Sequence, residues 1–217
     1  MTTLATSSLN TASVFTLPDP NGLQRVLYRI PLLAYRLGLG AMMDRFRIAA
    51  LTTRGRTSGK PRFAALEYRQ HGSKVYILSG WGEQANWVRN LEHDSCVTLR
   101  RGQRVQGARA EVVRDRSEVF RALTLFYRTN PAYYERLFKQ AGQRGQLDAL
   151  SLPQIADRVV VVRVNPEAGP ALLPAAPVDA SALGALLAVA LLLLTIGGPI
   201  AAITGAVRRS RRKCQAE

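Results

Sequence analysis

The sequence has 217 residues, 47% of them apolar, and a formal net charge of +15 from 30 Lys and Arg against 15 Asp and Glu. The apolar content excludes a disordered polyelectrolyte, and the length allows one domain with a hydrophobic core plus an appendage. A charge of this size favours anionic partners: nucleic acid, anionic lipid, or a phosphorylated or carboxylate-rich ligand. An Arg-biased composition also produces such a charge without any partner, so the charge alone does not show that the protein binds an anion.

Cysteine and histidine are too sparse to suggest a redox or metal framework. Cys96 and Cys214 are far apart, and His71 and His93 are the only histidines. Neither a disulfide framework nor a metal site is expected from these spacings.

The N-terminal part of the chain divides into a polar leader and a basic amphipathic stretch. Residues 1–22 lack the charged start and apolar core of a signal peptide, so we expect a disordered leader. Residues 21–46 have apolar residues at helical spacing with Arg between them, and Pro31, Gly38 and Gly40 are expected to break this helix into short pieces. Such a stretch either lies on a membrane surface or packs on the domain, and both interpretations stay open.

From residue 47 the apolar residues follow the alternation of strands. Strands are predicted over residues 47–55, 62–69, 74–80, 95–101, 104–113 and 158–164. One helix is predicted over residues 83–93. Another begins after Asp115, which has the spacing of an N-terminal cap, and a third follows Pro131. Short antiparallel strands with helical insertions favour a mainly β fold, a small β-barrel over residues 23–164.

The C-terminal part has the composition of a linker followed by a membrane anchor. Residues 165–180 are rich in Pro and Ala and are predicted to be a linker. Residues 180–207 contain no charge, which is long enough to cross a bilayer, so we predict one transmembrane helix over residues 181–207 and a basic tail over 208–217. On this interpretation the chain is held at the cell membrane by a single C-terminal anchor, with the barrel in the cytoplasm. The basic tail alone would favour the opposite orientation, with the tail in the cytoplasm and the barrel outside, so the orientation stays open.

Residues 52–62, TTRGRTSGKPR, form a candidate anion site. Glycines let backbone N–H groups approach a phosphate, the hydroxyls of Thr57 and Ser58 can donate, and Arg binds phosphate or carboxylate in a bidentate manner. The spacing is not that of a P-loop. Alternation along the strand predicts that Arg54 and Arg56 lie on one side, joined by Arg62 after the turn. A solvated hairpin tip is the alternative interpretation.

Residues 78–91, LSGWGEQANWVRNL, form a second candidate. A strand ends in Ser-Gly-Trp-Gly and a helix begins soon after, so the backbone is accessible and a helix N-terminus favours an electron-rich group. Trp81 and Trp87, the only tryptophans, bracket this turn. Ordinary core packing is the alternative for each ring.

In combination, the two stretches resemble the deazaflavin-dependent nitroreductase family of split β-barrel (FMN-binding-like) oxidoreductases, which use coenzyme F420. The resemblance covers roughly residues 23–164 and is carried by Arg54-Gly-Arg-x-Ser-Gly-Lys-x-Arg62, Ser79-Gly-x-Gly82 and Asn86-Trp-Val-Arg-Asn-Leu91. It implies a cofactor with a phosphodiester and an oligoglutamate tail that transfers a hydride. The predicted membrane anchor, and not the resemblance, suggests the acceptor: a lipid-soluble quinone or another apolar enone or nitro-compound.

The resemblance also implies which residues form the site. The cofactor-binding candidates are Arg54, Arg56, Ser58, Lys60, Arg62, Ser79, Gly80, Trp81, Gly82, Trp87 and Asn90. Tyr133 and Tyr134 are the catalytic candidates on the substrate side, as donors of a proton or hydrogen bond, and a helix-packing aromatic cluster is the alternative for each.

Several functional alternatives stay open beside this one. The same barrel can bind FMN in an FMN-dependent oxidoreductase, and a non-catalytic protein that binds an anionic cofactor fits the same residues. Nucleic-acid binding is not expected, because basic and aromatic residues do not interleave on one strand face and no helix-turn-helix pattern is present. The acceptor and the oligomeric state are left open, with a homodimer as one option.

Overall fold

The computed structural model describes residues 22–140 and 152–179. The elements in chain order are α1 (Gly22–Arg36), α2 (Gly40–Arg45), β1 (Ile48–Arg54), β2 (Pro61–His71), β3 (Lys74–Ser79), the 3-10 turn η1 (Gly82–Gln84), α3 (Asn86–His93), β4 (Cys96–Arg101), β5 (Arg104–Val112), α4 (Arg116–Thr129), α5 (Pro131–Gln140), α6 (Leu152–Ala156) and β6 (Val160–Pro166).

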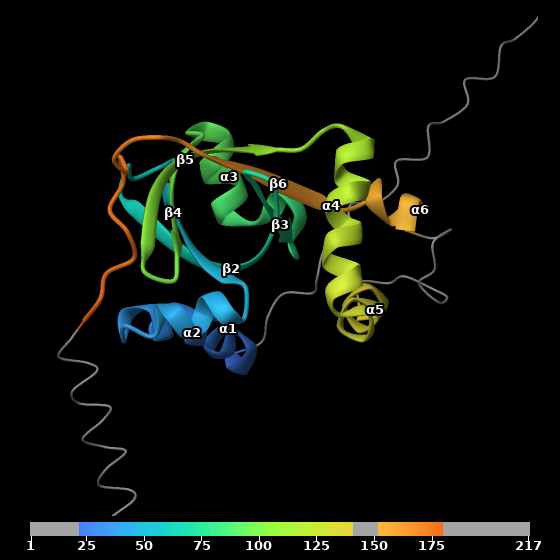
Figure 1. Cartoon of the computed structure of the whole chain (residues 1–217), viewed down its shortest axis with the longest axis horizontal. Helices are drawn as coiled ribbons and strands as arrows, with labels where there is room; N and C mark the ends of the chain where they lie inside the picture. Colours follow the sequence, from blue (N-terminus) through green and yellow to red (C-terminus); the bar gives the residue numbers. More distant parts are fainter. Residues whose placement is uncertain (1–21, 141–151, 180–217) are drawn as a thin grey trace, which may run out of the picture.

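The six strands close into an antiparallel barrel with the order β1-β2-β3-β6-β5-β4 (Figure 1). Closure is made by β1 and β4, where Leu51 lies opposite Leu99. Closing a sheet leaves no unpaired edge strand. The barrel predicted from the sequence is therefore confirmed.

Two of the hairpins turn at a glycine in the left-handed region. Gly72 has φ +60° between β2 and β3, and Gly102 has φ +58° between β4 and β5. A residue with a Cβ atom is strained there, so glycine is the residue that the turns require.

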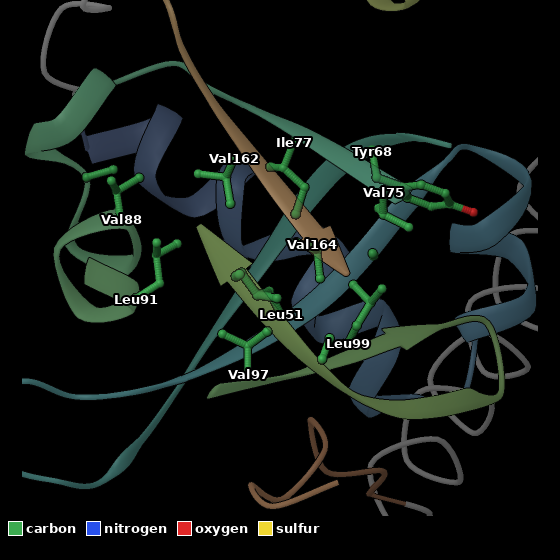
Figure 2. Close-up of a cluster of buried hydrophobic side chains, with 14 of the residues drawn as sticks. Leu51, Tyr68, Val75, Ile77, Val88, Leu91, Val97, Leu99, Val162 and Val164 are labelled. Carbon is green, nitrogen blue, oxygen red and sulfur yellow. The ribbon is translucent and has the colours of Figure 1, made fainter. Parts of the chain in front are cut away.

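The barrel interior is filled by side chains from all six strands, which are aliphatic except for Tyr68 of β2 (Figure 2). Val88 and Leu91 of α3 pack into the same cluster, which fixes α3 to the barrel. The helix predicted from residue 83 thus begins at Asn86, because the chain first forms the turn η1.

The helices α4, α5 and α6 pack outside the barrel around a second buried cluster that contains Phe126, Tyr134 and Phe138. Asp115 caps α4, as predicted, by accepting hydrogen bonds from the backbone N–H groups of Ser117 and Glu118.

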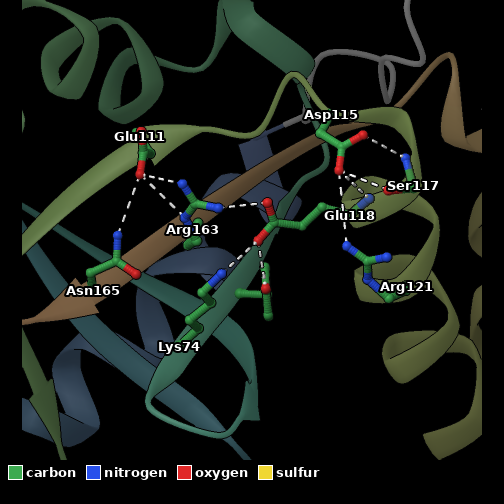
Figure 3. Close-up of polar contacts among 9 residues, drawn as sticks. Lys74, Glu111, Asp115, Ser117, Glu118, Arg121, Arg163 and Asn165 are labelled. Atoms are coloured by element: carbon green, nitrogen blue, oxygen red, sulfur yellow. Dashed lines mark hydrogen bonds and ion pairs between the residues drawn. The ribbon is translucent and has the colours of Figure 1, made fainter.

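The Glu118 side chain lies against the barrel wall and not back over its own helix (Figure 3). Its carboxylate accepts hydrogen bonds from the Tyr76 hydroxyl at 2.7 Å and from the Arg163 guanidinium at 2.5 Å. Lys74 Nζ lies 3.5 Å from the same group. Glu118 therefore ties α4 to β3 and β6.

The N-terminal stretch forms two helices that pack on the outer face of β1. Tyr35 is fully buried, and its hydroxyl donates to the carbonyl of Ile48 at 2.8 Å. The expectation that Pro31 breaks the helix was wrong, because α1 continues through this residue. The helix loses one backbone hydrogen bond at proline, and burial of residues such as Tyr35 against the barrel offsets that loss. The chain turns at Gly38, which has φ +78°.

The chain that follows β6 runs along the barrel surface. Leu173 and Ala176 are buried, the Thr98 hydroxyl donates to the Leu173 carbonyl at 2.7 Å, and the Arg100 guanidinium donates to the Ala176 carbonyl at 2.7 Å. Residues 167–179, most of the predicted linker, are thus attached to the barrel.

The predicted leader over residues 1–22, apart from its last residue, and the predicted membrane helix and basic tail over residues 181–217 lie outside the described residues. Within residues 22–140 and 152–179, the structure contains no helix with the length and hydropathy needed to cross a bilayer.

Candidate functional site

A cavity of about 990 Å³ opens between the β1–β2 loop, the turn after β3, the start of α3 and the helix α1. Its volume lies at the upper end of the roughly 300–1,000 Å³ that small-molecule and cofactor sites occupy. Its lining residues are Arg29, Thr53, Gly55, Arg56, Thr57, Ser58, Arg62, Phe63, Ala64, Trp81, Gln84, Ala85, Asn86, Trp87 and Asn90. The lining combines three guanidinium groups with two indole rings, so it suits an anionic, aromatic ligand.

The β1–β2 loop is a tight turn with little spare space. The N–H of Gly55 donates to the Lys60 carbonyl at 2.9 Å, and the N–H of Gly59 donates to the Gly55 carbonyl at 2.7 Å. A Cβ atom on Gly55 would lie 3.0 Å from Ser58 Oγ and 3.1 Å from the Lys60 carbonyl oxygen. Glycine at residue 55 therefore allows the loop to close, and the closed loop holds Arg56, Thr57 and Ser58 against the cavity.

Arg56 is held by two asparagines of α3. The backbone N–H of Arg56 donates to Asn90 Oδ1 at 3.2 Å, and its guanidinium donates to Asn90 Oδ1 at 3.3 Å and to Asn86 Oδ1 at 3.2 Å. Asn90 is buried and donates in turn to Thr53 Oγ1 at 3.2 Å. Neutral acceptors orient the guanidinium without cancelling its charge, which leaves that charge available to an anion.

The opposite wall is built on the turn after β3. Ser79 is buried and its hydroxyl donates to the Gly82 carbonyl at 2.7 Å, which closes the turn. Gly82 has φ +56°, a conformation that favours glycine. This turn places Trp81 in the cavity wall, and α3 adds Trp87.

The structure brings six of the eleven predicted cofactor-binding residues to the cavity: Arg56, Ser58, Arg62, Trp81, Trp87 and Asn90. The remaining five, which are Arg54, Lys60, Ser79, Gly80 and Gly82, do not line it. Ser79 and Gly82 form the turn after β3 instead. Lys60 has an exposed side chain, and its backbone carbonyl accepts a hydrogen bond from Gly55 within the loop.

Arg54 was expected beside Arg56 and lies elsewhere. Its Nε donates to Asp94 Oδ2 at 2.8 Å. The pKa of the Asp94 carboxyl is lowered, because the backbone N–H of Cys96 and the Arg54 guanidinium stabilise the anion against the opposing effect of burial. The strand ends at Arg54, so the two-residue alternation used for the prediction does not extend to Arg56.

Some cavity residues were missed from the sequence. Arg29 and Phe63 are the clearest cases: Arg29 comes from α1, and Phe63 lies on the outer face of β2, where it packs against the α1–α2 cluster. No local motif marks either residue. Asn86 is the first residue of the motif Asn86-Trp-Val-Arg-Asn-Leu91, and this place in the motif could have identified it. In the structure its exposed amide oxygen accepts a hydrogen bond from the Arg56 guanidinium.

The two catalytic candidates lie together on α5 and do not line the cavity. Tyr134 is fully buried, and its hydroxyl donates to Glu67 Oε2 at 2.8 Å. Burial and then the Glu67 carboxylate raise the pKa of Tyr134 well above its ordinary value. Tyr133 is 47% exposed and packs edge to face on Tyr134, with the ring centroids 5.1 Å apart.

The chain thus has a split-barrel-like fold with a cationic, tryptophan-lined cavity. A sequence model of the F420H(2)-dependent quinone reductase family matches residues 29–143, more than half of the 217 residues. The chain belongs to this family. The resemblance to deazaflavin-dependent oxidoreductases is thereby confirmed, and the matched range contains the cavity residues.

Solved structures with a similar fold share little sequence with the chain. An F420-H2 dependent reductase is 19% identical over 54% of this chain and 93% of its own, with a TM-score of 0.41. The heme storage protein HutZ from Vibrio cholerae is 17% identical over 62% and 92%, with a TM-score of 0.39. General Stress Protein 26 from Bacillus anthracis is 14% identical over 60% and 89%, with a TM-score of 0.36. No curated protein matches the chain. The family assignment rests on the family model.

Proposed function

We propose that this chain is an oxidoreductase that binds reduced coenzyme F420 in the cavity and passes a hydride to a lipid-soluble acceptor, a quinone in the first place. The proposal rests on one observation: the cationic loop residues and the two tryptophans line the same cavity. These residues are Arg56, Ser58, Arg62, Trp81 and Trp87. Membership of the F420H(2)-dependent quinone reductase family supports the choice of cofactor and acceptor. Enones and nitro-compounds are further acceptors of the same chemistry.

The residues present fit a polyanionic deazaflavin. Arg56 and Arg62 supply charge for a phosphodiester or carboxylate, and Ser58 and Thr57 supply hydroxyl donors. Gly55 lets the loop close on itself, since a Cβ atom there would crowd Ser58 and the Lys60 carbonyl, and the closed loop presents Arg56, Thr57 and Ser58 to the cavity. Trp81 and Trp87 offer flat apolar surfaces for a tricyclic ring. We assign the anionic part of the cofactor to the loop and its ring to the tryptophans.

When bound, the reduced cofactor supplies two electrons as a hydride and one proton, which converts a quinone to its quinol. The protein's own contribution is to position the cofactor and the acceptor and to exclude water from between them. Asn90 and Asn86 orient Arg56, which would fix the anionic end of the cofactor. Trp81 and Trp87 would shield a ring that lies against them from water.

Tyr133 is the candidate for relaying the proton to the reduced acceptor, because its side chain is exposed, although it does not line the cavity. Tyr134 is a weaker candidate, because burial and Glu67 hold its proton firmly. FMN remains the alternative cofactor, since the same loop suits its phosphate. A non-catalytic protein that binds F420 is the remaining alternative.

The test is turnover by the full chain in detergent micelles that contain a menaquinone analogue. Reduced F420 and reduced FMN are supplied separately, and reoxidation is followed by the return of their absorbance. We expect quinone-dependent oxidation of reduced F420, with a large loss in the Arg56→Ala/Arg62→Ala variant. Oxidation of reduced FMN but not of reduced F420 would show that FMN is the cofactor. Binding of F420 without turnover on quinone, enone or nitro-compound would favour the non-catalytic alternative.

A further inference from the structure

The exposed surface of α1, α2 and the turns that follow them carries five large apolar residues. Their exposed fractions range from 40% for Leu39 to 61% for Phe46. We call this surface the α1–α2 face; its apolar members are Ile30, Leu33, Leu39, Met42 and Phe46. Most of the large hydrophobic side chains that are exposed in the described residues belong to it. Exposed apolar residues that are scattered singly are ordinary, whereas a group of them is a feature of docking surfaces.

The opposite side of the same helices is firmly packed on the barrel. Ala34, Tyr35 and Met43 are buried with Ala50 of β1. Arg100 lies 5.2 Å from the centre of the Tyr35 ring, and a Cβ atom on Gly40 would lie 2.5 Å from the Gly102 carbonyl oxygen. The helices cannot approach the barrel more closely there. The exposed residues are therefore surplus to the core and point away from it.

Positive charge surrounds the α1–α2 face. Four exposed arginines stand next to the apolar residues in the sequence: Arg29, Arg36, Arg45 and Arg47. The exposed Arg104 begins β5, directly after the β4–β5 turn that contacts α2. The nearby carboxylates are engaged: Asp44 accepts a hydrogen bond from the Tyr68 hydroxyl at 2.6 Å, and Asp179 lies 4.0 Å from Arg36. An apolar surface with a basic rim fits the headgroup region of an anionic bilayer.

The segment after β6 leads to the same face. It lies along the barrel through the contacts of Leu173 and Ala176, and the N–H of Asp179 then donates to the Arg36 carbonyl at 2.6 Å. Figure 1 shows this segment descending from β6 towards the side of the molecule that carries α1 and α2. The sequence continues from this point with 28 uncharged residues, 180–207. The long apolar part of the chain thus begins beside the α1–α2 face.

We propose that the α1–α2 face docks on the surface of an anionic lipid bilayer. The basic rim, the apolar centre and the apolar sequence that starts beside Arg36 all favour lipid over a second copy of the chain, because a second copy would bring the same positive charge. The proposal concerns a partner and does not depend on the cofactor.

One consequence does rest on the proposed function. Arg29 and Phe63 line the cavity, and Phe63 also packs against the cluster beneath α1 and α2. A bilayer on the α1–α2 face therefore lies next to one wall of the cavity. The bilayer would then hold a lipid-soluble acceptor next to that wall.

The proposal is tested with the full chain reconstituted in vesicles of phosphatidylcholine alone or with phosphatidylglycerol. Both native cysteines are replaced (Cys96→Ser, Cys214→Ser), and a nitroxide label is attached at Phe46→Cys or, independently, at Met42→Cys. The matched control is His93→Cys, an exposed residue of α3, which lies across the barrel from α1 and α2 in Figure 1. Accessibility to oxygen and to a water-soluble nickel chelate is measured for each label.

We expect oxygen accessibility to rise several-fold relative to nickel accessibility at both Phe46 and Met42, more with phosphatidylglycerol than without, while the His93 label stays nickel-accessible. Nickel-accessible labels at Phe46 and Met42 in vesicles that hold the chain would overturn the proposal. Labels shielded from both reagents would also overturn it, because a second copy or another part of the chain would then cover the face. Titration of the same labelled proteins with F420 reports the proposed function separately.

Discussion

Asn90 accepts two hydrogen bonds from Arg56, one from the backbone N–H at 3.2 Å and one from the guanidinium at 3.3 Å. The same amide donates to Thr53 Oγ1 at 3.2 Å. A buried residue of α3 therefore sets both the loop conformation and the direction of the cation that faces the cavity. The two sequence motifs act as one unit through this contact.

Asn90→Ala should weaken F420 binding although Asn90 carries no charge. Without its amide the Arg56 side chain samples more directions, and we expect about a tenfold loss of affinity, or about 1.4 kcal/mol. The lost partner of Thr53 should also lower the free energy of unfolding by about 1–2 kcal/mol. The matched control is Asn86→Ala, which removes only the exposed contact to the guanidinium. Equal affinities for Asn90→Ala and the parent, measured by fluorescence titration, would limit Asn90 to stability.

Gly55 and Gly59 should respond differently to alanine. Gly59 has φ +66° and open space around it, so Gly59→Ala should cost about 1 kcal/mol of backbone strain and little affinity. Gly55→Ala forces a Cβ atom against Ser58 Oγ and the Lys60 carbonyl, which must move the loop and weaken F420 binding. Unfolding and binding measured on both variants separate the two effects. Wild-type affinity in Gly55→Ala would show that the loop adapts without consequence.

Tyr134→Phe should act on stability more than on rate. The hydroxyl is buried against Glu67, whose other oxygen accepts a hydrogen bond from Arg69 at 2.5 Å. Its loss should lower the free energy of unfolding by about 1–2 kcal/mol. Because the raised pKa keeps Tyr134 protonated, the rate of F420H2 oxidation should show no new pH dependence near neutrality.

Tyr133→Phe is the matched control for this pair, since Tyr133 is exposed. We expect unchanged stability and, if Tyr133 donates the proton, a lower rate. A collapse of the rate in Tyr134→Phe with normal stability would instead make Tyr134 the catalytic tyrosine.

Glu118 should make stability depend on pH in the acid range. Burial acts to raise the pKa of Glu118, but hydrogen bonds from Tyr76 and Arg163 outweigh it and lower the pKa below its ordinary value. The charged form therefore stabilises the fold fully above the unfolded-state pKa of about 4.3, and this contribution is lost as the pH falls through the lower folded-state value.

Glu118→Gln should reduce the free energy of unfolding by about 2 kcal/mol at neutral pH, since Arg163 loses a partner in a largely buried contact. The difference from the parent should shrink at acid pH, below the ordinary range of a glutamate. Glu167→Gln removes an exposed partner of Arg109 and serves as the control, with little effect expected. A difference that is constant with pH would contradict the assignment to the Glu118 charge.

The local parts of the fold were predictable from the sequence. Each of the six strands has an alternating or continuous apolar pattern, and the turns at Gly72 and Gly102 follow from glycine between two such patterns. Asp115 marks its helix because capping depends only on neighbouring residues. The barrel required one further step, the pairing of β1 with β4, which no local pattern encodes.

The site was predictable in part, because motifs report residue types and not the directions of side chains. Arg56 and Trp81, which belong to the two different motifs, line one cavity, whereas Arg54 pairs with Asp94, 40 residues later in the chain. Arg29 joins the cavity from a helix that precedes the barrel. Such contacts arise from the packing of distant segments, and a pattern within one segment does not contain them.

The most direct test of the account is the affinity of the full chain for oxidised F420, compared between Arg56→Ala and Arg54→Ala. Both variants remove one positive charge from the same hairpin, but only Arg56 lines the cavity. We predict saturable binding weakened by salt, an affinity reduced about tenfold or more in Arg56→Ala, and a much smaller change in Arg54→Ala. Equal losses of affinity in the two variants would show that the loop attracts F420 only through its overall positive charge. No binding of F420 to the parent protein would contradict the assignment of the cavity to this cofactor.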